Sequence, residues 1–113
     1  MAAARSRWGR AGLSEYEYQV RSERGGRLNP SWDGRVRVED GVASVADGEE
    51  PTVGHLVSTV EELFARIGEG IAEGKVVSAA YDAETGAPVF FSIDWYLAQT
   101  DGPGERRWIT LAK

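Results

Sequence analysis

Residues 59–96 decide the fold class, and they read TVEELFARIGEGIAEGKVVSAAYDAETGAPVFFSIDWY. Thr59 and Glu62 have the spacing of a capping box, in which each side chain accepts a hydrogen bond from the backbone amide of the other residue. Ser58 and Glu61 have the same spacing one residue earlier, so the helix starts at one of these two caps. The apolar residues that follow recur at helical spacing, and these are Val60, Leu63, Phe64, Ile67 and Ile71. The pattern predicts one amphipathic helix over residues 59–73, ended by Gly74.

Two strands joined by a tight turn follow this helix. Residues 75–81 are small or β-branched, and residues 89–96 alternate so that Phe91, Ile93 and Trp95 share one face. Such alternation is typical of a strand in a half-buried sheet. The turn between them begins at Asp82, a residue type that accepts backbone amides in turns.

The other elements follow from the same signals on either side of this stretch. An alanine-rich segment predicts a short first helix, and alternating apolar residues predict four more strands. Asp40-Gly41 predicts a two-residue hairpin, because glycine readily takes the positive φ that such turns need. The ranges are 2–12 for the helix and 15–23, 34–39, 42–46 and 106–111 for the strands.

The element order is therefore helix, three strands, helix, three strands. It predicts an α+β fold in which an antiparallel sheet packs against the helix at 59–73. A length of 113 residues suits one core, so we expect residues 1–113 to form one domain.

Composition excludes several classes of function. There is no cysteine, which rules out disulfides, thiolate metal sites and cysteine nucleophiles. A net charge of −5 disfavours binding to nucleic acid. No apolar run approaches the roughly 20 residues that span a membrane, and no export signal is visible. The chain as it stands is expected to be cytoplasmic unless a leader was removed.

The ordered set of motifs resembles a bacterial family, the domain of unknown function 6174. It comprises Trp8, Tyr16-x-Tyr18, Val36-x-Val38 before Asp40-Gly41, the helix start at 59–64, Tyr81-Asp82 with Gly86-x-Pro88, and Ile93-Asp94. The resemblance covers about residues 8–112. It implies a small exported or lipoprotein-like protein, particularly of actinobacteria, with no assigned activity, so it supplies no catalytic residues. The chain lacks the lipobox cysteine of such lipoproteins.

Carboxylates are the first candidates for chemistry. Asp82, Glu84 and Asp94 could act as acid and base or hold a metal if they met in a pocket. The structural alternative is that Asp82 caps a turn and Asp94 accepts amides at a strand end. The spacing of a calcium loop is absent, and no cofactor or metal is predicted. The lone His55 precedes the main helix, and no nucleophile motif accompanies it.

The large aromatic residues are the second group of candidates. Four of them fall in the sheet or its loops, namely Trp32, Trp95, Tyr96 and Trp108. They either complete the core or, where exposed, form a face that binds a partner or ligand.

Three hypotheses for function follow. The first is a non-enzymatic interaction or accessory domain that acts through a sheet face or loops on an unknown protein or small ligand. The second is a small-ligand or peptide-binding domain with a pocket between the helix at 59–73 and the sheet, lined by Phe64, Phe91 and Trp95. The third is a hydrolase-like enzyme that uses Asp82 and Asp94.

Overall fold

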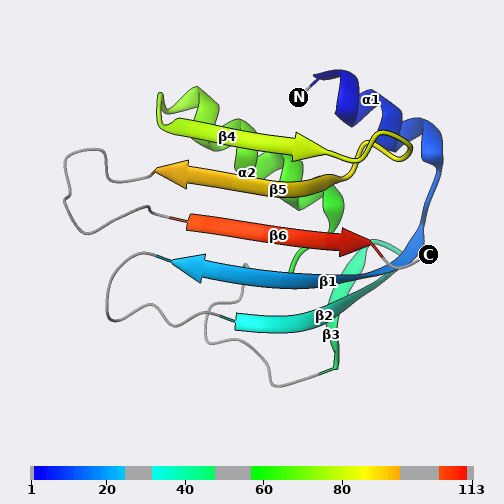
Figure 1. The fold of residues 1–113 in the computed structure, drawn as a ribbon. Coiled ribbons are helices and arrows are strands. Elements are labelled where there is room, and N and C mark those ends of the chain that lie inside the picture. The colour runs from blue at the N-terminus through cyan, green and yellow to red at the C-terminus, as the bar shows by residue number, and fades with distance from the viewer. Residues whose placement is uncertain (1, 25–31, 48–56, 95–104, 112–113) are drawn as a thin grey trace.

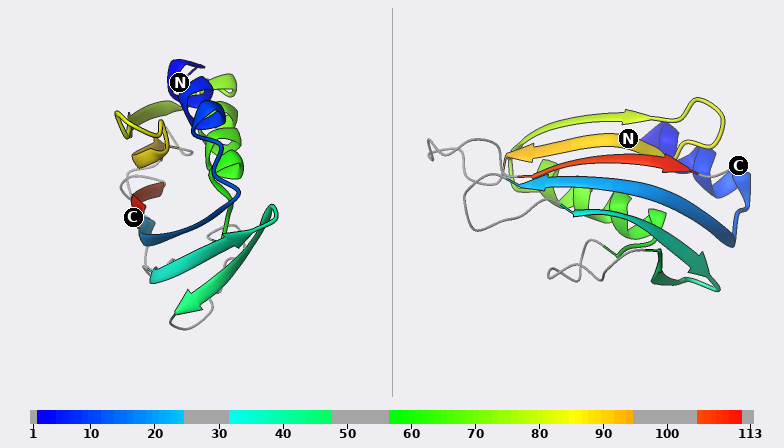
Figure 2. Two further views of the ribbon diagram at one scale, coloured as in Figure 1. Left: turned by 90° about the vertical axis from the view of Figure 1, so that its right-hand side faces the viewer. Right: turned by 60° about the horizontal axis from the view of Figure 1, so that its bottom comes forward.

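The computed structural model describes residues 2–24, 32–47, 57–94 and 105–111. The helices are α1 (Ala2–Ala11) and α2 (Val60–Ala72), and the strands are β1 (Glu15–Arg24), β2 (Trp32–Glu39), β3 (Val42–Asp47), β4 (Val76–Tyr81), β5 (Pro88–Asp94) and β6 (Glu105–Leu111). Six antiparallel strands within these ranges form one sheet, in the order β3-β2-β1-β6-β5-β4. Both helices lie on the same side of it (Figures 1 and 2). The predicted α+β class and element order are confirmed.

The start of α2 has the predicted capping box. The Thr59 Oγ1 accepts from the Glu62 amide at 3.1 Å, and the Glu62 Oε1 accepts from the Thr59 amide at 2.9 Å. At the other end Gly74 has a φ of +72°, which lets the chain leave the helix. The Asp40-Gly41 hairpin is also confirmed, with positive φ at both residues.

One position of the predicted apolar stripe is wrong. Ile71 is 53% exposed, and Gly70 is the buried residue at this end of α2. A Cβ added to Gly70 would lie 3.0 Å from the Ile93 Cγ2 and 3.2 Å from the Val77 Cγ2. The helix therefore comes so close to β4 and β5 that only a residue without a side chain fits easily.

The helix-facing side of the sheet carries the core. Alternation places apolar side chains of the central strands under α2, as predicted, and those that are buried include Tyr18, Val20, Val36, Val38, Phe91, Ile93 and Ile109. Phe64 of α2 stacks on Tyr81 of β4, with ring centroids 5.9 Å apart. The main helix is thus held by contacts with strands at both the centre and the edge of the sheet.

Helix α1 packs at the end of the sheet where β4 turns into β5. Its Trp8 ring meets Tyr16 edge-on at 5.1 Å, and the Trp8 Nε1 donates to the Glu61 Oε1 of α2 at 3.2 Å. The turn before β5 contacts α1 at Gly86, which has a φ of +83°. A single buried tryptophan therefore joins α1 to both β1 and α2.

Two tyrosine hydroxyls fix the start of α2 on β1. The Tyr16 hydroxyl accepts from the Val60 amide at 2.8 Å, and the Tyr18 hydroxyl donates to the Ser58 carbonyl at 2.5 Å. Burial raises the pKa of both phenols, that of Tyr18 to about 12. The neutral hydroxyl of Tyr18 is thus part of the folded structure.

Changing Tyr18 to phenylalanine is expected to lower the free energy of unfolding by about 1–2 kcal/mol at pH 7, because the buried Ser58 carbonyl loses its donor. The folded pKa of Tyr18 lies above the ordinary value of 10, so its contribution is complete below pH 10 and is lost as the pH rises through about 12. Urea unfolding between pH 8 and about 12 measures this. Stability should fall less steeply above pH 10 in Tyr18→Phe than in the wild type, and identical slopes would contradict the assignment.

Candidate functional site

The side of the sheet away from the helices is not covered by any described element (Figure 2). Strand register places outward-facing residues of β1, β2 and β6 side by side there. They are mostly charged or polar and exposed: Gln19, Arg21, Asp33, Arg35, Arg106 and Thr110. We call this surface the open face.

Trp108 is the large aromatic residue of the open face, and it is 36% exposed. Its ring packs against Phe90 of β5 with a centroid distance of 5.3 Å. The guanidinium carbon of Arg21, its cross-strand neighbour, lies 5.4 Å from the ring centroid. A cation over an indole adds about 0.5–1 kcal/mol at an exposed site. The indole is thus held in a fixed position while part of it stays open to a partner.

A shallow hollow of about 440 Å³ lies beside Trp108 on the open face. Its side chains include two arginines, Arg21 and Arg35, and one carboxylate, Asp33. Arg106 is exposed on the same face of β6. Among the described side chains, the arginines around the indole therefore outnumber the carboxylate, although the whole chain is acidic.

The other aromatic candidates do not join this face in the described structure. Trp32 pairs with Ser22, which is buried on the helix side, so its ring lies on the side of the sheet opposite to Trp108. There it is half-buried against the core and lies over Gly34. Trp95 and Tyr96 fall outside the described residues. Of the four aromatic candidates, Trp108 alone is described on the open face.

Asp82 has the predicted turn-capping role. Its Oδ1 accepts from the amides of Glu84 and Thr85, both at 2.8 Å. Asp94 is the last residue of β5, whereas the turn that contains Asp82 comes before the first residue of this strand. The side chain of Asp94 lies outside the described part of the structure. β5 is seven residues long, so the two positions lie at opposite ends of the strand, roughly 20 Å apart. The structure does not bring the proposed acid–base pair together.

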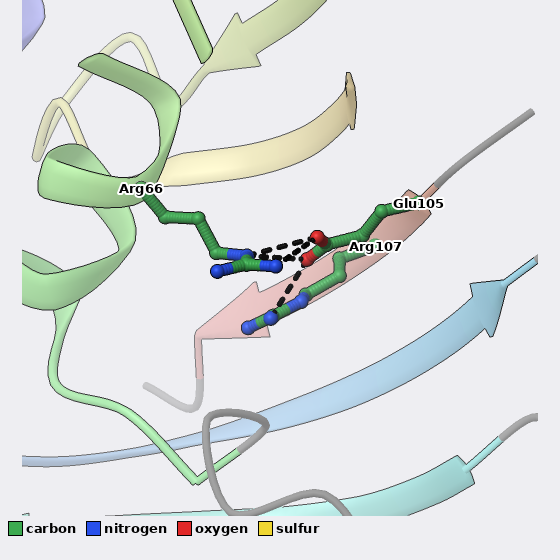
Figure 3. Close-up of polar contacts among 3 residues, drawn as sticks. All are labelled: Arg66, Glu105 and Arg107. Atoms are coloured by element: carbon green, nitrogen blue, oxygen red, sulfur yellow. Dashed lines mark hydrogen bonds and ion pairs between the residues drawn. The ribbon is translucent and has the colours of Figure 1, made fainter. Parts of the chain in front are cut away.

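Sequence reasoning missed a buried ionic cluster between α2 and β6. The fully buried Glu105 carboxylate accepts hydrogen bonds from Arg66 of α2, whose Nε lies 2.8 Å from Oε1 and 2.9 Å from Oε2. It also forms an ion pair with Arg107 of its own strand, whose Nη2 lies 2.7 Å from Oε2 (Figure 3). Arg107 is also fully buried and lies 5.3 Å from the Phe91 ring centroid.

Burial lowers the pKa of the Arg107 guanidinium, and the adjacent Glu105 acts in the opposite direction. A signal for the cluster was present in the sequence. Strand alternation puts Glu105 and Arg107 in phase with the buried Ile109, which places both charges on the core side. Charged residues are almost never fully buried unless they are paired, so Arg66 on the facing helix completes the arrangement.

Comparison with models of protein families identifies the family of this chain. The model described as "Family of unknown function (DUF6174)" matches residues 1–103. The chain belongs to this family. The comparisons with curated proteins and with solved structures found no match.

The motif residues that resemble DUF6174 are mostly fold determinants in this member. Contacts of Trp8, Tyr16 and Tyr18 hold α1, β1 and α2 together. Thr59 caps α2, and Gly86 lies against the backbone of α1. Trp108 is absent from that motif set. In this DUF6174 chain the family motifs therefore account for the fold. The binding properties of the exposed surface follow from the residues on that surface.

The interior of this DUF6174 chain can be compared with the predicted ligand pocket between α2 and the sheet. Phe64 and Phe91, two of the three side chains expected to line it, are 0% exposed, so no water-sized space adjoins either ring. The third, Trp95, lies outside the description. Among the described residues no three His, Cys, Asp or Glu side chains are placed to hold a metal. Neither described helix is both long and apolar enough to cross a membrane.

Proposed function

We propose that this protein is a non-enzymatic interaction domain that binds a partner through the open face of its sheet. The observation that carries the proposal is the Trp108 indole, partly exposed and held between Phe90 and Arg21. Tryptophan and arginine are enriched among the residues that dominate binding energy at protein interfaces. The turn-capping use of Asp82 supports a scaffold role for that carboxylate.

The charge around Trp108 favours an acidic protein segment as the partner. Arg21, Arg35 and Arg106 lie near the indole on one face, with Asp33 as the carboxylate of the adjoining hollow. Arginine pairs with carboxylates through two parallel hydrogen bonds, and an aromatic side chain of the partner would stack on the indole. We infer that the domain recognises a stretch that contains Asp or Glu beside an aromatic residue, rather than nucleic acid.

Selection from a random peptide library on the full chain tests this proposal. We expect the selected peptides to be rich in Asp or Glu with an aromatic residue, and to bind less tightly as salt is raised. Trp108→Ala should weaken a selected peptide about 30-fold, measured by fluorescence anisotropy, as expected for a central interface tryptophan. The matched control is Val42→Ala, which shortens another exposed apolar side chain, in β3.

Two outcomes would overturn the proposal. One is a set of peptides whose affinity does not change in Trp108→Ala. The other is a labelled single-stranded oligonucleotide that binds the open face more tightly than any selected peptide. Unfolding of Trp108→Ala in urea shows beforehand whether the variant keeps its fold.

The resemblance also supports a bacterial, exported protein in which residues 1–113 form a single domain. We propose this location for a form in which an export signal precedes residue 1. Fractionation of source cells with an antibody to the domain tests it, because an exclusively cytoplasmic signal would contradict export.

A further inference from the structure

The sheet divides at the end where β6 finishes. β6 pairs with β5 only from Glu105 to Trp108, but it continues along β1 as far as Leu111, opposite Tyr18. β5 begins at Pro88, which has no amide hydrogen to donate to a neighbouring strand. Beyond Trp108, β6 therefore follows β1 and leaves β5.

A cleft of about 660 Å³ opens at this division. It lies between the start of β5 and the end of β6, and it is bordered by the turn at 82–87 and by the chain just before and at the start of β1. Clefts that hold small molecules have volumes of about 300–1,000 Å³. The side chains on both sides belong to the sheet and its turn, so the shape is set by the fold itself.

The wall of the cleft is largely apolar. Its apolar side chains include Leu13, Tyr16, Val89, Trp108, Ile109 and Leu111. Leu13 is 40% exposed and Trp108 is 36% exposed, and these are two of the four most exposed large apolar residues in the described part of the chain. Apolar surface gathered in one concave place is a mark of a binding site.

The charged groups that line the cleft all have the same sign. They are Glu15, Asp82 and Glu84, and none of the described lining residues is Lys, Arg or His. Asp82 uses its Oδ1 for the turn amides but still contributes negative charge. Opposite charges in close contact attract even in water, and these three carboxylates line one cleft.

We propose that this cleft binds a small organic cation, with its apolar body against Leu13 and Leu111 and its ammonium group near Glu15 and Glu84. The site is distinct from the hollow on the open face, although Trp108 and Thr110 border both. The inference does not rest on the proposed recognition of acidic segments, which uses arginines on the other side of Trp108.

The test uses the full chain and two probes with the same tail and opposite charge, octylammonium and octanoate. NMR amide shifts are followed during titration. We expect octylammonium to shift Val89, Ile109 and Leu111 saturably, with an affinity about tenfold higher than that of octanoate, since 1.4 kcal/mol of charge preference corresponds to tenfold. The preference should shrink as salt is raised.

Variants assign the two parts of the site. Leu13→Ser should weaken octylammonium about fivefold, because roughly 1 kcal/mol of apolar contact is lost. The combined change Glu15→Gln and Glu84→Gln should reduce the preference for octylammonium over octanoate, with Asp82 keeping part of it. Ile71→Ser is the matched control, since Ile71 is an exposed apolar residue on α2 that does not line the cleft, and it should change neither affinity.

Three outcomes would overturn the inference. The first is the absence of saturable shifts at the cleft. The second is equal affinity of octanoate and octylammonium in the wild type, which would show apolar contact without charge selection. The third is a set of shifts confined to Gln19, Arg21 and Arg35 on the open face. Acidic peptides can still bind the open face in each case, so the two proposals fail separately.

Discussion

Replacing Glu105 with glutamine is expected to lower the free energy of unfolding by about 3–5 kcal/mol, the usual cost of removing one partner from a buried ion pair. Glutamine has nearly the same shape but no charge. Arg66 and Arg107, which now both contact the carboxylate, would face each other without it in a place where Arg107 has no exposed surface. Domains of this size are stable by only about 5–15 kcal/mol, so this loss is a large fraction of the total stability.

Urea unfolding followed by circular dichroism measures the loss. Glu84→Gln, which removes a carboxylate from an exposed turn position, is the matched control and should change stability by less than about 0.5 kcal/mol. Adding Arg107→Met to Glu105→Gln should recover much of the loss, because it removes one of the two facing cations and leaves an apolar side chain over Phe91. Equal stabilities of Glu105→Gln and Glu84→Gln would mean that the cluster is solvated rather than buried.

Replacing Gly86 with alanine is expected to cost about 3 kcal/mol of stability and to release α1 from the turn before β5. The left-handed backbone at a φ of +83° costs an alanine about 1–2 kcal/mol. The added Cβ would lie 2.1 Å from the Ala4 carbonyl oxygen and 2.9 Å from the Trp8 nitrogen, which are backbone atoms of α1. The helix must therefore move, and the buried Trp8 becomes exposed to water.

Two other glycines separate the backbone cost from the clash. Gly74 has a φ of +72° with nothing within 4 Å of a Cβ, so Gly74→Ala should lose only the conformational part, about 1 kcal/mol. Gly9 lies within α1 and also has open space, so Gly9→Ala should gain up to about 1 kcal/mol. Urea unfolding and tryptophan emission of the three variants provide the comparison. If Gly86→Ala and Gly74→Ala lose the same amount, α1 does not press on the turn.

The local features of this fold were readable from the sequence because their causes are local. The capping box at Thr59, the hairpin at Asp40-Gly41 and the turn at Asp82 each depend on residues within a few positions. Strand order was not readable in the same way. The pairing of β1 with β6 joins residues about 90 positions apart, and no short-range pattern encodes it.

The candidate site was predictable only in part, and the reason lies in strand phase. Alternation back from Val36 through Gly34 already puts Trp32 on the core side, and alternation from Ile109 puts Trp108 outside. The predicted strands begin at residues 34 and 106, so the prediction places neither Trp32 nor Glu105 on a face of the sheet. The cleft depends on where β6 leaves β5, which only the three-dimensional register shows.

The central pairing of β1 with β6 also has a consequence for protein synthesis (Figure 1). Because β1 is made early and β6 about 90 residues later, β1, one of the two middle strands of the sheet, lacks one neighbour for most of translation. Such late, non-local pairing slows folding and leaves an open strand edge on the nascent chain. A ribosome-bound chain that stops before Glu105 should therefore be far more sensitive to protease and to aggregation than one that includes Leu111.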